Sequence, residues 1–84
     1  PDDAAVYAVR GGMYQKRRQS ALALKDMNRA IELKPGNADF YISRALLYRD
    51  FKKMDLATAD FRKAIELGAS AEECASMMID TNEE

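Results

Sequence analysis

Small and aromatic residues recur along this sequence at helical spacing, in stripes that each fit one face of a helix. A first stripe, at positions i, i+4 and i+7, occurs twice: Tyr7, Gly11 and Tyr14, and then Tyr41, Ala45 and Tyr48. A second stripe follows each of these: Ala23, Met27, Ala30 and Ile31, and then Ala57, Phe61, Ala64 and Ile65. The pattern predicts four amphipathic α-helices, near residues 4–17, 21–33, 38–51 and 55–67.

The two halves of the pattern are copies of each other, offset by 34 residues. Tyr41 follows Tyr7 at this offset, and the run Ala30-Ile31-Glu32-Leu33 returns unchanged as Ala64-Ile65-Glu66-Leu67. A period of this length is typical of stacked supersecondary units. Because each period holds two helical stripes, each unit is predicted to be a pair of helices.

Residues that start and stop helices agree with these boundaries. The dipeptide Pro35-Gly36 separates the two units, and Asn37 is a good N-cap for the helix that follows it. Ser20 and Asp55 stand where the second helix of each pair should begin. Gly68 should end the fourth helix, and the run Ser70-Ala71-Glu72-Glu73 has the form of a capping box that opens a fifth helix, over about 71–81.

Taken together, these units resemble the tetratricopeptide repeat, over residues 4 to about 69. The resemblance rests on the aromatic–small–aromatic run of the first helix, the spacing of alanines around Met27 or Phe61 in the second, and the proline that follows. The glycine common at the bend between paired helices is replaced by Arg18 and Lys52, and Ala69 replaces the second proline.

The resemblance implies an all-α superhelix, or solenoid, of two antiparallel helix pairs plus a fifth helix. We expect a single domain over residues 1–84, with repeat 1 over about 4–37, repeat 2 over about 38–71 and the C-terminal helix over about 71–81. The first helix of each pair should line a concave groove, and small residues such as Gly11 should let the helix axes approach closely.

Two pairs of charged residues recur in both copies at the same separation. Arg10 recurs with Asp26, and Arg44 with Asp60, one residue on each helix of a pair. Duplication of this kind predicts a structural ion pair. The alternative is that the arginines are presented to a ligand.

If the first helices line the groove, a mixed set of side chains faces into it. The candidate binding residues are Ala8, Gln15, Lys16, Asp39, Ile42, Leu46, Arg49 and Asp50, with Ala5 and Gly12 beside them. An apolar floor with polar ends suits a peptide or protein segment, so the predicted function is that of a protein–protein interaction scaffold. The alternative is that these residues face solvent or cover a missing neighbouring repeat.

Some members of the family that this chain resembles bind the C-terminal carboxylate of chaperones through lysine and asparagine side chains on the inner faces. The matching positions here hold Ala8, Gly12 and Ser43. The resemblance therefore does not extend to chaperone-tail binding.

Composition narrows the remaining functions. The chain has 13 basic and 14 acidic residues, one cysteine and no histidine, so neither an internal disulfide nor a zinc site of the usual Cys/His type is expected. Without a histidine to activate Cys74, a phosphate-binding glycine loop or a convergent polar pocket, we predict neither enzyme activity nor a cofactor. Cys74 is expected to be a small buried hydrophobe, and the tyrosines to be core residues.

Nucleic acid and membrane are likewise not expected as partners. The basic run Lys16-Arg17-Arg18 ends a predicted helix, where cations complement the helix dipole, and no aromatic residue is interleaved for base stacking. No apolar stretch is long enough to span a bilayer. Because the chain begins at Pro1 rather than Met, we expect a piece of a longer protein, whose compartment stays open, with the cytoplasm as the default.

The fifth helix suggests a second function. Met77, Met78 and Ile79 give it apolar residues on more than one side. It should cap the stack with one stripe and leave another exposed. The alternative to a peptide-binding scaffold is therefore a structural segment that forms a homo-oligomer through this Met-rich helix.

Overall fold

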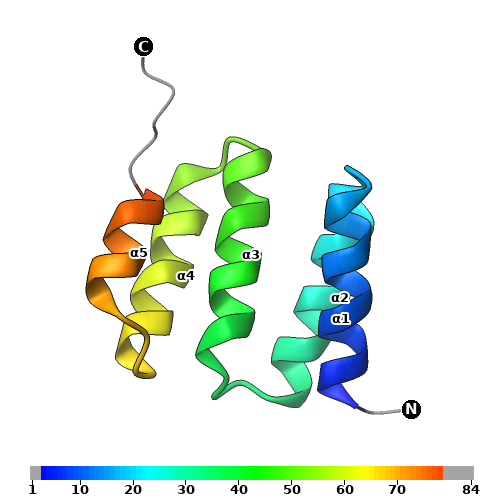
Figure 1. The fold of residues 1–84 in the computed structure, drawn as a ribbon, viewed down its shortest axis with the longest axis horizontal. Helices are drawn as coiled ribbons and strands as arrows, with labels where there is room; N and C mark the ends of the chain where they lie inside the picture. The colour runs from blue at the N-terminus through cyan, green and yellow to red at the C-terminus, as the bar shows by residue number, and fades with distance from the viewer. Residues whose placement is uncertain (1–2, 79–84) are drawn as a thin grey trace.

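The computed structural model describes residues 3–78, which form five α-helices joined by short turns (Figure 1). The helices are α1 (Ala4–Lys16), α2 (Ser20–Leu33), α3 (Ala38–Asp50), α4 (Met54–Glu66) and α5 (Ala71–Met78). The bounds of the first four helices agree with the predicted ranges to within one residue at each end. The predicted end of the fifth helix near residue 81, together with Ile79, lies outside the described residues.

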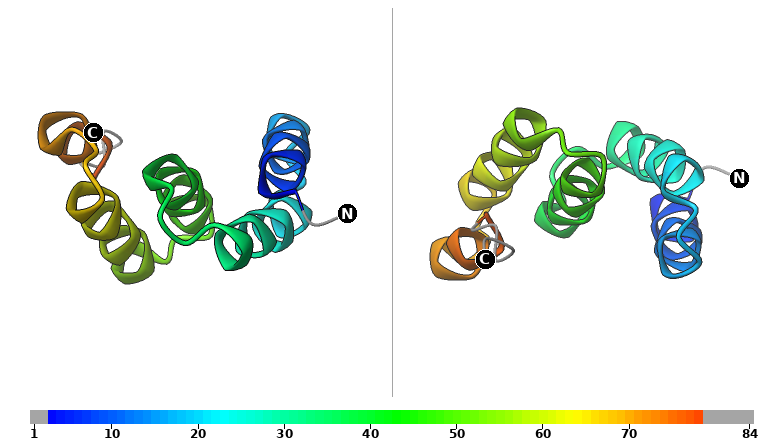
Figure 2. Two further views of the ribbon diagram at one scale, coloured as in Figure 1. Left: turned by 90° about the horizontal axis from the view of Figure 1, so that it is seen from below. Right: turned by 90° about the horizontal axis from the view of Figure 1, so that it is seen from above.

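The helices pack as consecutive antiparallel pairs. α1 packs against α2, α3 against α4, α2 joins the two pairs by packing against α3, and α5 packs on α4. Figure 2 shows α1, α3 and α5 on one side of the molecule and α2 and α4 on the other. The predicted all-α solenoid is confirmed.

Equivalent caps begin the first helix of each pair. The Asp3 carboxylate accepts the backbone N–H of Ala5 at 2.9 Å, and the Asn37 side chain accepts that of Asp39 at the same distance. At α5, the Ser70 hydroxyl accepts the N–H of Glu73 at 3.2 Å. Each cap satisfies one of the backbone donors that a helix start leaves without a partner.

The second helices begin differently from the prediction. Ser20 is the first residue of α2 and Asp55 the second residue of α4, and neither is the cap. The cap positions are held by Gln19 and Lys53, which make no side-chain capping bond. The tight turns before these helices fix where they start, so a capping side chain is not required.

Those turns hold Arg18 and Lys52 in the left-handed region, with φ of 62° and 63°. In the first turn, the N–H of Gln19 donates to the Tyr14 carbonyl at 2.9 Å, and the N–H of Arg18 donates to the Gln15 carbonyl at 3.0 Å. This is the Schellman arrangement, in which glycine is preferred because it has no Cβ to clash. Arg18 and Lys52 therefore adopt the bend conformation for which glycine is common at this position, and the clash of their Cβ atoms costs conformational energy.

The buried hydrophobic side chains of the described residues form two clusters, each centred on one helix pair and each including one residue of the other pair. The first contains Ala4, Ala23, Met27, Ala30 and Leu47, and the second Ile31, Tyr41, Ala45, Ala57, Phe61, Ala64 and Cys74. Most members come from the predicted stripes, and Cys74 is buried as expected.

Leu47 was not part of any predicted stripe. It is fully buried, and it reaches from α3 into the cluster of the first pair. It therefore fastens one unit to the next.

Gly11 lies at a close approach of α1 to α2. A Cβ at this position would lie 3.1 Å from Met27 Sδ and 3.3 Å from the Ala23 carbonyl oxygen. A Cβ at the neighbouring Gly12 would meet nothing within 4 Å. The predicted close approach therefore applies to Gly11, and packing does not require glycine at Gly12.

Candidate protein-interaction face

Each helix pair is joined by an arginine held in a two-pronged contact with an aspartate. Arg10 Nε and Nη2 donate to the Asp26 carboxylate at 2.8 and 2.7 Å, and Arg44 donates through the same atoms to Asp60 at 2.8 Å each. Both aspartates are buried. Two parallel charge-assisted bonds of this kind fix the geometry of a pair as well as its charge.

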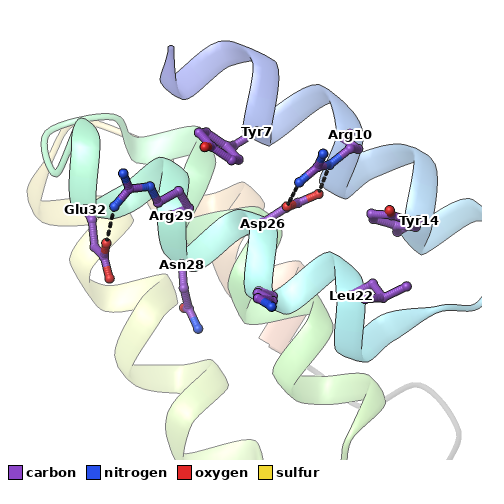
Figure 3. A pocket seen from close by; sticks show the side chains of 9 residues that line it. Tyr7, Arg10, Tyr14, Leu22, Asp26, Asn28, Arg29 and Glu32 are labelled. Atoms are coloured by element: carbon purple, nitrogen blue, oxygen red, sulfur yellow. Dashed lines mark hydrogen bonds and ion pairs between the residues drawn. The ribbon is translucent and has the colours of Figure 1, made fainter. Parts of the chain in front are cut away.

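The tyrosines of the first helices lie on either side of these arginines. The Arg44 guanidinium carbon lies 5.6 Å from the ring centroids of both Tyr41 and Tyr48. Figure 3 shows the corresponding arrangement in the first pair, where Arg10 points to Asp26 between Tyr7 and Tyr14. The aromatic–small–aromatic run thus gives each buried ion pair a cation–π setting.

Only one of the four tyrosines is buried, with 8% of its surface exposed. Tyr41 belongs to the second cluster and donates its hydroxyl to the Pro35 carbonyl at 3.0 Å. Tyr7, Tyr14 and Tyr48 are partly buried. The expectation that the tyrosines are core residues therefore applies fully to Tyr41, whereas the others flank the arginines at the edge of the core.

Both arginines stay charged. The hydrogen bond to Asp26 raises the pKa of Arg10, and the bond to Asp60 raises the pKa of Arg44 against the opposing effect of burial. Arg44 also donates through Nη1 to the Asn28 side chain of the preceding pair at 3.0 Å. Arg44 therefore contacts Asp60 of its own helix pair and Asn28 of the preceding pair at the same time.

The candidate groove residues divide into two sets. Asp39, Lys16 and Asp50 are exposed, and Ala8, Gly12 and Gln15 are partly buried. Ile42 and Leu46 are also partly buried, because they pack against the second cluster, with Met77 and Met78 of α5 packed on the same cluster. Arg49 donates to the Met77 carbonyl at 2.6 Å, so it ties α3 to α5.

The structure brings Gln15 and Asp50 together at one end of this surface. With Arg18 and Ser20 they line a recess of about 540 Å³ between the α1–α2 turn and the end of α3. The recess offers a cation, a carboxylate, an amide and a hydroxyl, which suit the backbone and polar side chains of a polypeptide. Arg18 and Ser20 were not among the predicted binding residues, since the sequence identified them only as a turn and a helix start.

We call the surface that carries these residues the α1–α3 face. Its members are Ala8, Gly12 and Gln15 of α1, Asp39, Ile42, Leu46 and Asp50 of α3, and Arg18 and Ser20 at the edge. α1 and α3 make few direct contacts with each other. The face therefore holds a polar recess beside partly exposed apolar side chains.

Metal-binding clusters and membrane-spanning helices were two further features to look for among the described residues. No group of three or more His, Cys, Asp or Glu side chains within residues 3–78 has the arrangement of a metal site. No described helix is both long and apolar enough to cross a membrane.

An antiparallel helix pair repeated at a 34-residue offset, with an open face on its first helices, defines a helical-repeat scaffold. The family model for the tetratricopeptide repeat matches residues 4–37 and 38–68. The chain therefore belongs to the tetratricopeptide repeat family, as its sequence predicted. This is a family of non-catalytic repeat scaffolds whose members generally mediate protein–protein interactions. A search of curated proteins finds no match to the chain.

Proposed function

We propose that this chain is a non-catalytic scaffold module that binds a peptide or protein segment along the α1–α3 face. The observation that carries the proposal is the recess formed by Gln15, Arg18, Ser20 and Asp50 beside the partly exposed Ala8, Ile42 and Leu46. The apolar side chains supply anchors for a ligand side chain. The recess supplies donors and acceptors that fix the ligand's register.

The charges of the face favour a ligand with a mixed charge pattern. At one end Arg18 and Asp50 lie in the same recess, and at the other Asp39 is exposed. Arg49 is engaged with α5, so α5 helps to hold α3 in place rather than leaving Arg49 for a ligand. We propose on this basis that Arg49 has a structural role, and that Asp50 and Arg18 supply the specificity.

The proposal is tested by selecting peptides from a displayed library against the intact chain and measuring their affinities by fluorescence polarisation. Asp50→Arg is the main variant, because Asp50 is exposed and its replacement does not disturb the core. Leu46→Glu is a second variant, with far-UV circular dichroism to show that it folds. Leu56→Glu on α4 is the matched control, since Leu56 is an exposed leucine away from the face.

Binding should weaken by about tenfold or more in Asp50→Arg, which corresponds to roughly 1.4 kcal/mol, and stay unchanged in Leu56→Glu. Selected peptides that bind Asp50→Arg and folded Leu46→Glu as tightly as the unmodified chain would contradict the proposal.

The alternative raised by the sequence, self-association through α5, needs Met77 and Met78 to be exposed on one side. Both are partly buried and pack against the second cluster. Oligomer formation through α5 stays a prediction that no observation here favours.

A further inference from the structure

The largest exposed apolar side chains of α1 lie along one stripe. Val6, Val9 and Met13 are 53%, 63% and 51% exposed, and with Ala5 and Arg10 they line a shallow apolar depression. We call these five residues the α1 end face. Figure 1 shows α1 in the helix pair at one end of the stack.

The second unit shows which kind of element packs against such a face. The 34-residue offset places Phe40 and Leu47 of α3 at the positions of Val6 and Met13. Leu47 is fully buried in the cluster that contains Met27 of α2, and Phe40 packs against the same cluster. On the second unit, therefore, this face is covered by α2, a neighbouring helix that runs antiparallel to α3.

The exposed fractions of the two ion-paired arginines support the same comparison. Arg44 is 21% exposed, and Asn28 of the covering helix accepts its third hydrogen bond. Arg10 is 56% exposed on the equivalent position of α1. The face that carries Val6, Met13 and Arg10 therefore resembles the face of α3 that packs against an antiparallel helix. Among the described residues, no helix covers this face of α1.

We propose that the helix that covers the α1 end face is α1 of a second copy of this chain, in a two-fold antiparallel pair. The charges at the two ends of α1 are complementary in this orientation. Asp3 is exposed at the start of the helix, and Lys16 and Arg17 are exposed at its end. Antiparallel pairing brings Asp3 of each copy to the basic end of the other, and Val6 of each copy near Met13 of the other.

The centre of the pair tolerates the two Arg10 side chains. Each Arg10 is already neutralised by its own Asp26 through two hydrogen bonds, so the two-fold axis does not bring together unpaired like charges. Because the face is one helix wide, the area buried falls at the low end for specific interfaces, and the dimer is weak. It forms by mass action at high protein concentration.

The test is molar mass by sedimentation velocity and light scattering over a concentration series of the intact chain. The unmodified chain should approach the mass of a dimer and go no further. Val9→Glu, which places a charge at the centre of the pair, should weaken dimerisation by about tenfold or more. The control Leu56→Glu makes the same change at an exposed leucine of α4, and it should dimerise like the unmodified chain.

A charge pair tests the orientation. Arg17→Glu should weaken the dimer, because it faces Asp3 of the other copy with a like charge. Adding Asp3→Asn should restore much of the loss, and it keeps the helix cap, since Asn37 caps α3 in the same way. Circular dichroism checks that each variant is folded.

Three results would overturn the inference. A strict monomer at all concentrations would leave the α1 end face without a second copy. A mass that rises beyond the dimer would show a head-to-tail contact instead of a two-fold one. Loss of dimer in Met78→Glu with no effect of Val9→Glu would move the interface to α5. None of these results bears on peptide binding at the α1–α3 face, so the two proposals fail independently.

Discussion

Alanine substitution at the two adjacent glycines of α1 measures how closely α1 and α2 approach. In a helix interior, glycine is less favourable than alanine by about 1 kcal/mol. A Cβ at Gly12 meets no atom within 4 Å, so Gly12→Ala should gain the full amount. For a domain of this size the midpoint of thermal unfolding should rise by roughly 4–8 °C.

Gly11→Ala carries the same gain but adds a methyl group in a tight space. The new Cβ would lie 3.1 Å from Met27 Sδ and 3.3 Å from the Ala23 carbonyl oxygen. Met27 is 2% exposed, so its side chain has little room to move, and the carbonyl belongs to the backbone of α2. Overpacking of this kind typically costs about 1–3 kcal/mol, so the net effect of Gly11→Ala should be neutral or destabilising.

The assay is urea unfolding followed by far-UV circular dichroism, with both variants compared with the unmodified chain. A change in the midpoint at constant slope reports a change in stability. Equal stabilisation by the two substitutions would refute the close approach at Gly11. Destabilisation by Gly12→Ala would refute the open space beside Gly12.

Three further predictions concern the turns, the ion pairs and the thiol. Lys52→Gly should raise the free energy of unfolding in urea by about 1 kcal/mol, because glycine adopts the left-handed conformation of this position without the steric clash of a Cβ. Arg44→Met should lower it by about 3 kcal/mol, because Asp60 is left buried and unpaired, and by more than Arg10→Met, whose site is more exposed. Burial raises the pKa of Cys74 above its ordinary 9.0, so stability should fall as the pH rises above that value, and this slope should be smaller in Cys74→Ala.

The helices and the ion pairs could be predicted because both are repeated. Tyr7 and Tyr41 share a helical stripe at a 34-residue offset, and the recurrence of Arg10 with Asp26 in a second copy singled out that pair for close contact. Two copies of one pattern remove most of the ambiguity that a single stripe leaves. The sequence alone was therefore sufficient for the fold and its internal charges.

Contacts between units could not be predicted in the same way. Leu47 and Met13 occupy the same position in the two copies, yet one is fully buried and the other is half exposed. The difference depends on whether a helix lies beside them, which the pattern within one unit does not contain. The recess between Gln15 and Asp50 also depends on how two units stack. The engagement of Arg49 with α5 was missed for the same reason.

To test whether the α1–α3 face binds a polypeptide, a selected peptide is titrated into ¹⁵N-labelled protein and the amide chemical shifts are followed. The expected result is that the largest changes fall on residues of that face, with Gln15, Ser20 and Asp50 prominent among them, and that Asp50→Arg abolishes them. Changes confined to Val6, Val9 and Met13, or the same changes in Asp50→Arg, would contradict it.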